Sequence, residues 1–374
     1  HTLKLAVFTV SGALLWKKDL GEGVVPGIWF SPLLALDLDR DAIDELWIIN
    51  NRDPDHPLNY RQYVLQKLNP ETGEMEADIP WRNPEVPQEL SHLYRHFLLG
   101  AWVRGEPLLL TAQGTYGPMK IQAWNDGLTL RWEHVIPANA PGALGSHVTP
   151  VVDLDGDGID ELLWGERCIE LDQGKQLFCA DEASWEGHSD IIQPVFDYDN
   201  RTWGIFTCRE SFNDLAPRLV MFNQNGKRIW GDLDSGHLDT GWAARLGDDG
   251  DPVVLGVRVG EKIRTAAGER RTRVEEFTYD AFSGEKLELG FSVYTSIPVD
   301  LNGDGIHELV KGYFEGTGEV MDRNGKILGN VGGLAAMACK FTSLPGEQIL
   351  SYSKDGWIRI WADENAADKP RALD

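Results

Sequence analysis

An acidic ten-residue segment recurs along this chain, and it constrains the fold more than any other sequence feature. The clearest copies are DLDRDAIDEL from Asp37, DLDGDGIDEL from Asp153 and DLNGDGIHEL from Asp300, and each lies between two short apolar segments. Weaker copies lie between and after them, which gives seven units of roughly 51 residues from Asp37 to about Phe341. A repeat of this length indicates an array of similar small structural units.

A second pattern recurs in the later half of each unit. It consists of a short strand, a turn that contains Gly, and another strand that often ends in Trp, as in WNDGLTLRW and NQNGKRIW. Four short strands per unit fit a propeller blade, and no segment shows the sustained 3.6-residue apolar period of an amphipathic helix. We therefore predict an all-β protein, a seven-bladed β-propeller that forms a single domain over residues 1–374, with eight blades as the alternative count.

The two ends of the chain fit the closure of such a ring. The first strand pair, in LKLAVFTVSGALLW, has no inner strands before it, and the last copy ends with one further strand in DGWIRIW. If the N-terminal strands complete the final blade, the ring has no open sheet edge. We expect this closure, and we expect the polar tail over residues 363–374 to fray.

The charge balance excludes some partners. The 374 residues include 35 Lys and Arg against 59 Asp and Glu, for a net charge of −24. Such a charge opposes non-specific binding to nucleic acid and to an anionic membrane surface. No apolar run approaches the roughly 20 residues that a membrane-spanning helix needs. We therefore expect a monomer with no nucleic-acid partner and no membrane partner.

Two of the four cysteines, Cys168 and Cys179, flank the segment CIELDQGKQLFC, which is typical of a β-hairpin that turns at Gln173 and Gly174. In that hairpin the two thiols would face each other within reach of a disulfide. The alternative is a pair of reduced core thiols.

The acidic segments place oxygen ligands at alternate positions around a tight turn. Ca²⁺ takes six to eight hard oxygens, so we predict a structural Ca²⁺ ion in at least one loop, with the second copy the best candidate. The alternative is a solvated Asx turn without metal. In either case we expect the loops to join neighbouring blades rather than to carry the chemistry. The candidate ligands are Asp37, Asp39 and Asp41 in the first copy, Asp153, Asp155, Asp157 and Asp160 in the second, and Asp300, Asn302 and Asp304 in the third, where His307 replaces the last Asp.

Other polar residues gather at the opposite ends of the strands. If the acidic loops join the first and second strands of each unit on one face, then the approach to each first strand and the loop after each second strand lie on the other face. His, Arg, Lys and Tyr recur there although the chain is acidic, which indicates an extended anionic ligand. For any single His the alternative is a capping or packing role. The residues are His96, His147, Arg167, His188, Arg209, His237, Arg258, Tyr294, Lys311 and Tyr313.

An anion held beside His, Tyr and Arg indicates one reaction in particular, β-elimination on a uronic-acid polysaccharide. The sugar loses its C5 proton and then its 4-O substituent, which requires a cation on the carboxylate, a base and an acid. Arg209 or Arg258 suits the carboxylate because a guanidinium binds it through two parallel hydrogen bonds. His188 is our first choice of base. We expect His147 and His237 to act as acid or binding groups, with Tyr294 as the alternative acid. We expect the remaining residues to bind substrate; they are Arg167, Lys311, Tyr313 and His96.

With these motifs the chain resembles the propeller polysaccharide lyases, both the seven-bladed ulvan and rhamnose-glucuronate lyases and the eight-bladed rhamnogalacturonan lyases. The resemblance rests on the DLDGDGIDEL loops, which also look like the calcium loops of integrin-type FG-GAP repeats, on the GH-x-D segments at His188 and His237, and on the Gly-turn hairpins. It implies a secreted, periplasmic or cell-surface lyase with paired His, a Tyr and an Arg at its centre. The chain departs from the seven-bladed lyases in one respect. Their two His lie about twenty residues apart, whereas Arg167 stands twenty residues after His147.

Two other classes of function fit parts of the sequence. A non-catalytic, calcium-stabilised carbohydrate-binding or adhesion propeller would keep the acidic loops and the aromatic residues but would need no base. A quinoprotein dehydrogenase fits less well, because its Trp-containing motif recurs more regularly and the chain has no vicinal cysteine pair. Formation of an unsaturated uronate product distinguishes a lyase from both.

Overall fold

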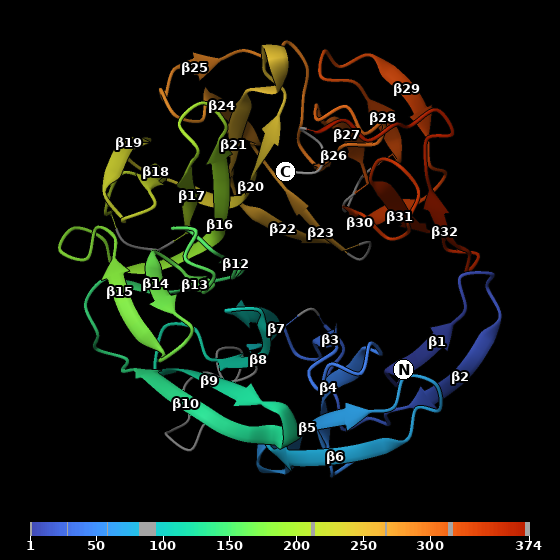
Figure 1. Ribbon diagram of the computed structural model, residues 1–374. Helices are drawn as coiled ribbons and strands as arrows, with labels where there is room; N and C mark the ends of the chain where they lie inside the picture. Colours follow the sequence, from blue (N-terminus) through green and yellow to red (C-terminus); the bar gives the residue numbers. More distant parts are fainter. Residues whose placement is uncertain are drawn as a thin grey trace. The chain divides into compact units, whose positions relative to one another are not determined.

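In the computed structural model, residues 2–27, 29–57, 59–81, 95–210, 214–265, 268–312 and 317–370 are described, and they form two compact units, His1–His188 and Ser189–Asp374. The described residues contain 32 strands and three short 3₁₀ helices, η1 (Tyr60–Gln62), η2 (Asp126–Leu128) and η3 (Asp248–Gly250). The all-β prediction is therefore confirmed (Figure 1). No helix in the described part of the chain is both long enough and apolar enough to cross a membrane.

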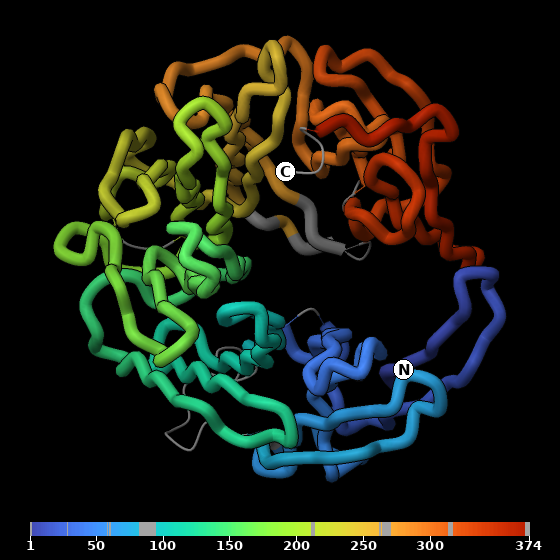
Figure 2. Tube along the Cα trace, in the orientation of Figure 1, coloured from blue at the N-terminus to red at the C-terminus, as the bar shows by residue number. Residues whose placement is uncertain are grey.

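The first unit consists mainly of four-stranded antiparallel sheets whose strands follow one another along the chain (Figure 2). It opens with a separate hairpin of β1 (Lys4–Phe8) and β2 (Leu14–Asp19). The sheets are β3 (Leu33–Leu36), β4 (Glu45–Asn51), β5 (Tyr63–Leu68) and β6 (Met75–Pro80); β7 (His96–Val103), β8 (Glu106–Gln113), β9 (Met119–Asn125) and β10 (Thr129–Ile136); and β12 (Val151–Val152), β13 (Glu161–Trp164), β14 (Arg167–Glu170) and β15 (Lys175–Cys179). Strand β11 (Ala143–Ser146) follows β10 along the chain.

The second unit repeats this arrangement. Its first strand, β16 (Gly187–Asp197), begins just before the unit boundary. The sheets are β16, β17 (Thr202–Glu210), β18 (Leu219–Asn223) and β19 (Arg228–Asp232); β20 (His237–Arg245), β21 (Pro252–Val259), β24 (Glu275–Asp280) and β25 (Lys286–Leu287); β26 (Ser296–Val299), β27 (Glu308–Lys311), β28 (Glu319–Met321) and β29 (Ile327–Asn330); and β30 (Leu334–Cys339), β31 (Gln348–Tyr352) and β32 (Ile358–Trp361). A separate hairpin joins β22 (Lys262–Thr265) to β23 (Gly268–Arg271).

The prediction of a closed seven- or eight-bladed propeller is wrong, because the described strands form separate open sheets. Strands β1 and β2 pair with each other and do not complete the last sheet, which has three strands, β30, β31 and β32. The N-terminal hairpin is bound instead to the sheet that follows it, since Trp16 Nε1 donates to the Pro70 carbonyl at 2.8 Å and Lys18 Nζ to the Gly73 carbonyl at 2.7 Å. The repeat specifies the pairing within each sheet but carries no signal for pairing between the two ends.

The recurring Gly turns and Trp residues join successive sheets within each unit. The indole Nε1 atoms of Trp16, Trp132 and Trp230 donate to carbonyl groups of the next sheet, at 2.8, 2.9 and 2.8 Å. Each ring lies against the glycine of a turn, and a Cβ on that glycine would come closer than 3.0 Å to the ring. The glycines, Gly73, Gly174 and Gly284, also have positive φ, so both the contact and the backbone require glycine.

Residues 363–370, which we expected to fray, are bound to the third acidic loop. The Ala367 N–H donates to the Asn302 carbonyl at 3.0 Å, and the Lys369 N–H donates to the Gly303 carbonyl at 2.8 Å. Asp368 forms an ion pair with Lys340 at 2.8 Å. Residues 371–374 lie outside the described residues.

Candidate active site

The acidic loops are held in shape by their own carboxylates. In the second copy, Asp153 accepts hydrogen bonds from the N–H groups of Gly156, Asp157 and Gly158 at 2.7–3.2 Å. These are Asx-type turns, in which a short acidic side chain caps the backbone that follows it. The positive φ of Gly156 and Gly158 allows the chain to turn this tightly.

A buried glutamate closes each of the three clear loops, and the sequence analysis missed it. Glu45, Glu161 and Glu308 accept the N–H of the residue seven positions earlier, at 2.9, 2.8 and 3.0 Å. In the last, weaker copy Gln348 accepts the Phe341 N–H at 2.8 Å, so an amide replaces the carboxylate. Burial raises the pKa of both Glu161 and Glu308 to about 7. The signal was present in the sequence, because Glu is the ninth residue of every clear copy.

The eighth residue of the loop binds the loop to the preceding sheet. Asp160 accepts the Trp102 N–H, and the Asp160 N–H donates to the Trp102 carbonyl at 3.0 Å. In the third copy His307 makes the same pair of bonds with Arg245, through Nδ1 at 2.8 Å and its own N–H at 3.0 Å. Burial first, and then the nearby Arg245 guanidinium, lower the pKa of His307 to about 3. The imidazole is therefore neutral and accepts a hydrogen bond as Asp160 does.

Two of the three loops bring together oxygen atoms that could hold a cation. Ligand atoms of Asp153, Asp155 and Glu161 lie within 4.8 Å of one another, as do those of Asp37, Asp39 and Asp41. The first loop already contains a cation of its own, because Lys67 Nζ lies 3.2 Å from Asp39 and 2.5 Å from Glu45. In the third loop other protein groups already bind these side chains, since the Asn302 amide donates to Glu308 at 3.1 Å and Arg245 of β20 pairs with Asp300 at 3.4 Å. The second loop thus fits Ca²⁺ best.

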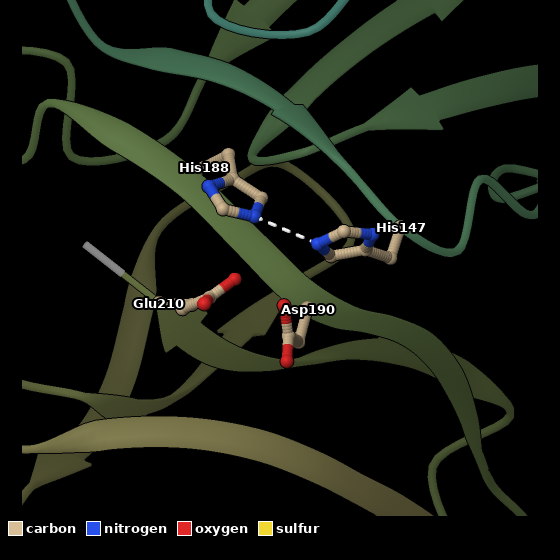
Figure 3. A group of neighbouring side chains, drawn as sticks. All are labelled: His147, His188, Asp190 and Glu210. Carbon is tan, nitrogen blue, oxygen red and sulfur yellow. Dashed lines mark hydrogen bonds between the residues drawn. The ribbon is translucent and has the colours of Figure 1, made fainter. Parts of the chain in front are cut away.

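The histidines at the predicted substrate face do meet in the first unit. His147 follows β11, His188 is the second residue of β16, and their Nε2 atoms lie 2.9 Å apart (Figure 3). The Tyr116 hydroxyl lies 3.4 Å from the same His188 nitrogen, with the two rings edge to face. Arg95 Nη1 lies 2.6 Å from His147 Nδ1 and 3.3 Å from His147 Nε2, and its guanidinium stacks on Trp29. His188 is buried, and the other groups are half-buried.

This network assigns the protons of the histidine pair. A guanidinium only donates hydrogen bonds, so His147 Nδ1, the nitrogen nearest Arg95, must accept. The proton of neutral His147 then lies on Nε2 and is donated to His188 Nε2. His188 Nε2 therefore carries a lone pair, which is the property of a base. Two neutral imidazoles at this separation could also bind one metal ion together.

Buried polar contacts fix the segments that carry this pair. Arg167, a predicted substrate ligand, is buried and donates to the carbonyls of Ala143, at 2.7 Å, and Pro141, at the start of the segment that ends at His147. The Tyr116 N–H donates to the Leu144 carbonyl at 2.9 Å, which ties the tyrosine turn to β11. Arg95 and Tyr116 were missed by the sequence analysis, because each lies in a connection without a repeated motif.

In the second unit, His237 lies between two carboxylates. Its Nε2 atom is 2.5 Å from Glu210 Oε1 and 2.9 Å from Asp239 Oδ1, and Arg271 pairs with the other oxygen of Asp239. Burial lowers the pKa of His237, but the hydrogen bonds to Asp239 and Glu210 outweigh it and raise that pKa to about 9. His237 is therefore a cation at neutral pH, which suits a proton donor or an anion ligand better than a base.

The GH-x-D segments explain part of this arrangement. In GHLD, His237 binds Asp239 two residues later, at a point where the register of β20 shifts by one residue. In GHSD, Asp190 follows His188 by two residues in β16, so the backbone directs both side chains to one face of that strand. Figure 3 also labels Asp190 and Glu210, which belong to the second unit.

The contacts of the remaining predicted residues involve other groups. Arg209 is buried and donates to the Pro217 carbonyl at 3.1 Å, and Arg258 pairs with Glu275 at 2.8 Å. Tyr294 packs against an apolar cluster beside Val293, and Lys311 ends β27. The other two are His96, which is buried with its ring against Tyr63 and Trp81, and Tyr313, which lies outside the described residues.

The proposed disulfide is absent, and all four cysteines are free thiols. The hairpin of β14 and β15 is present, but Cys179 pairs with Arg167 and Cys168 pairs with Phe178. A shift of one residue in register directs the two thiols to opposite faces of the sheet, which explains why the expected bond does not form.

The comparisons with known proteins agree with the resemblance noted in the sequence. No protein-family model matches the chain. The rhamnogalacturonan exolyase YesX of Bacillus subtilis (strain 168) is 27% identical over 311 residues, which is 70% of this chain and 49% of that protein. The rhamnogalacturonan endolyase YesW of the same organism is 25% identical over 273 residues, 64% of this chain and 43% of that protein. The chain thus spans about half the length of these curated relatives.

Solved structures give the same result for the fold. The crystal structure of the YesX lyase matches with a TM-score of 0.78 at 20% identity, over 97% of this chain and 66% of the other. A rhamnogalacturonan lyase of Bacillus licheniformis matches with a TM-score of 0.75 at 20% identity, over 97% of this chain and 65% of the other. The predicted resemblance to the rhamnogalacturonan lyases is therefore confirmed.

Proposed function

We propose that this protein is a polysaccharide lyase that cleaves rhamnogalacturonan, or a similar uronic-acid polysaccharide, by β-elimination. The observation that carries the proposal is the histidine pair in the first unit, with Tyr116 and Arg95 beside it. The similarity to proteins named rhamnogalacturonan lyases supports the substrate class. Because such a polymer lies outside cells, we also propose that the protein acts in a secreted, periplasmic or cell-surface setting.

The reaction assigns one task to each group of the network. The base removes the C5 proton of the uronate. His188 Nε2 suits this task because the hydrogen bonds of the network leave a lone pair on this nitrogen. Tyr116 is placed on the same nitrogen and can pass a proton to the departing 4-oxygen. A cation must stabilise the negative charge that develops on the carboxylate, and Arg95 is the guanidinium in contact with the pair.

The other predicted groups keep supporting roles in this proposal. His237, as a cation, suits binding of a second carboxylate of the polymer. Arg167 acts as a positioning residue because its bonds go to the segment before His147. Arg209, Arg258, Tyr294, Lys311 and His96 remain candidate substrate ligands.

We further propose one structural Ca²⁺ ion in the second acidic loop, held by Asp153, Asp155 and Glu161. The oxygen-only ligands suit this ion, and within the described part of the chain no Lys or Arg forms an ion pair with these three carboxylates. The ion would link the turn to the first residue of β13 and supply stability. No step of the proposed reaction uses it.

The decisive experiment is incubation of the purified protein with rhamnogalacturonan, ulvan and gum glucuronans. The unsaturated uronate end that β-elimination creates absorbs ultraviolet light, whereas hydrolysis creates no such group. Appearance of that absorbance supports the proposal. Binding to one of these polymers without any unsaturated product would contradict it and would favour a non-catalytic carbohydrate-binding protein.

A further inference from the structure

One aromatic side chain of the first unit, Trp29, contacts both partners of the hydrogen bond between Arg95 and His147. The guanidinium carbon of Arg95 lies 4.2 Å from the centroid of the Trp29 ring. The His147 imidazole lies against the same tryptophan, with the ring centroids 4.6 Å apart and the ring planes tilted by 43°. The tryptophan is therefore placed against both the donor and the acceptor of the bond that orients the histidine pair.

The backbone around Trp29 holds it in this place. Trp29 lies in a turn of the connection between β2 and β3, and the Ser31 N–H and Oγ both donate to the Gly27 carbonyl, at 3.1 and 3.2 Å, to close that turn. The Trp29 carbonyl accepts the His96 N–H at 2.8 Å. Because His96 directly follows Arg95, this bond fixes the tryptophan backbone beside the backbone of the arginine that its ring contacts.

Trp29 differs from the tryptophans that join successive sheets. The indole N–H groups of Trp16, Trp132 and Trp230 each donate to a carbonyl group. The Trp29 Nε1 atom is buried instead, and it has no hydrogen-bond partner among the described residues. Burial of an unpaired N–H group is unfavourable. The aromatic face, and not the N–H group, is therefore the part of Trp29 that the structure uses.

An aromatic face suits the task of holding an arginine in one orientation. A guanidinium over a Trp ring is attracted by the negative face of the ring, and Trp binds cations better than Tyr or Phe does. Stacking uses the face of the guanidinium, whereas its N–H groups donate hydrogen bonds in its plane. Trp29 can thus restrict Arg95 without competing for the hydrogen bond of 2.6 Å to His147 Nδ1.

We propose that Trp29 is a positioning residue for the histidine pair, because it holds Arg95 against His147 Nδ1 and thereby decides which nitrogen of His147 carries the hydrogen. Without the ring, Arg95 can leave Nδ1, and a neutral His147 can carry its hydrogen on Nδ1 instead. His147 Nε2 then accepts a hydrogen bond, so the hydrogen between the two rings comes from His188, which loses its lone pair on Nε2. The effect on turnover rests on the proposed function, but the position of the hydrogen does not.

The kinetic test compares Trp29→Leu and Trp29→Phe with a control, Trp357→Leu, at an exposed tryptophan whose ring also carries an arginine, Arg359, at 5.4 Å. With rhamnogalacturonan we expect kcat of Trp29→Leu to fall about five- to thirtyfold, which is the size of one partly desolvated cation–π contact. Trp29→Phe keeps an aromatic face and should recover most of this loss, while Trp357→Leu should match the wild type. In an Arg95→Ala background, Trp29→Leu should cost less than about twofold more, because residues that act as a unit are not additive.

Nitrogen NMR of protein labelled at histidine gives a readout that does not depend on activity, because a ring nitrogen with hydrogen resonates apart from one without it. The spectra are recorded above the range in which free histidine titrates, and His147→Asn assigns the signals. In the wild type and Trp29→Phe, His147 should carry hydrogen on Nε2 alone. In Trp29→Leu, a share of the molecules should carry it on Nδ1.

Leucine retains apolar volume because Trp29 also packs against the apolar cluster around Phe97, and the melting temperature checks folding. Trp29→Met serves the same test if the leucine variant does not fold. If the wild type forms no unsaturated product but the hydrogen moves as described, the proposed function fails and the role of Trp29 stands. An unchanged His147 spectrum in the non-aromatic variant, or a loss of kcat fully additive with that of Arg95→Ala, would overturn the role of Trp29.

Discussion

The Nε2 atoms of His147 and His188 lie 2.9 Å apart, and Arg95 lies 2.6 Å from the other nitrogen of His147. The arginine can only donate, so the proton of the pair lies on His147 and the lone pair on His188. The direction of this hydrogen bond follows from three residues that are far apart in the sequence.

Replacement of His188 tests the base directly. We expect His188→Ala to lower kcat by about 10²–10⁴, because that is the usual contribution of a positioned general base. Release of unsaturated product from rhamnogalacturonan measures it, with the melting temperature as a check of folding. His56→Ala, at an exposed histidine, is the matched control and should retain full activity. Turnover of His188→Ala near the wild-type rate would contradict the assignment.

Tyr116→Phe tests the proton donor while keeping the aromatic ring. The ring contact with His188 persists, but the hydroxyl 3.4 Å from His188 Nε2 is lost, so we expect kcat to fall by about 10²-fold or more with little change in stability. The control is Tyr352→Phe, at an exposed tyrosine of β31. If both variants cleave the polymer equally well, Tyr116 does not take part in the reaction.

Removal of calcium should act on stability through the second loop. We expect chelation to lower the melting temperature of the wild type, because an ion bound only to the folded state stabilises it. Asp155→Ala should abolish this sensitivity and leave turnover per folded molecule nearly unchanged. Asp39→Ala should keep the sensitivity, because Lys67 already occupies the first loop. A chelator that leaves the wild-type melting curve unchanged, with no metal found by elemental analysis, would refute the proposed ion.

His307 should make the protein sensitive to acid. Its pKa is about 3 in the folded state against about 6.5 when unfolded, so the unfolded chain binds the proton more readily. Its contribution to stability is therefore present above pH 6.5 and is lost as the pH falls from 6.5 toward 3, at up to about 1.4 kcal/mol per pH unit. His307→Asn can still accept the Arg245 N–H and should flatten this part of the curve in denaturant titrations. A variant with the same acid sensitivity as the wild type would place its origin elsewhere.

Two glycines with the same backbone conformation make it possible to measure the free-energy cost of crowding the Trp ring separately from the cost of the backbone conformation. Gly174 and Gly127 have φ of 70° and 69°, but a Cβ on Gly174 would strike the ring of Trp132 whereas one on Gly127 would meet nothing within 4 Å. Both Ala variants carry a cost of about 1–2 kcal/mol for the left-handed backbone. We expect Gly174→Ala to lose roughly 1–3 kcal/mol more in urea unfolding, from crowding of the ring. Equal losses would show that the stacked indole is easily displaced.

The sequence allowed prediction of what is encoded locally. The period-2 strands, the Gly turns and the acidic loops each lie within a few residues, and the strand content followed from them. The prediction of ring closure was wrong because pairing between distant strands has no local pattern. The predicted disulfide does not form because the register of the hairpin is shifted by one residue. Arg95 and Tyr116 could not be found, because only the tertiary structure brings these two residues of irregular connections to the histidines.

The joints between sheets have a consequence for how such a chain can evolve. Each joint consists of a Trp in the last strand of one sheet and a Gly turn in the next sheet, as in Trp132 with Gly174 and Trp230 with Gly284. A tandem duplication of the segment that encodes one sheet copies both the Trp and the Gly turn at once. The added sheet would meet its neighbours through contacts that already exist, so an ancestral gene could lengthen by whole sheets without a new kind of interface.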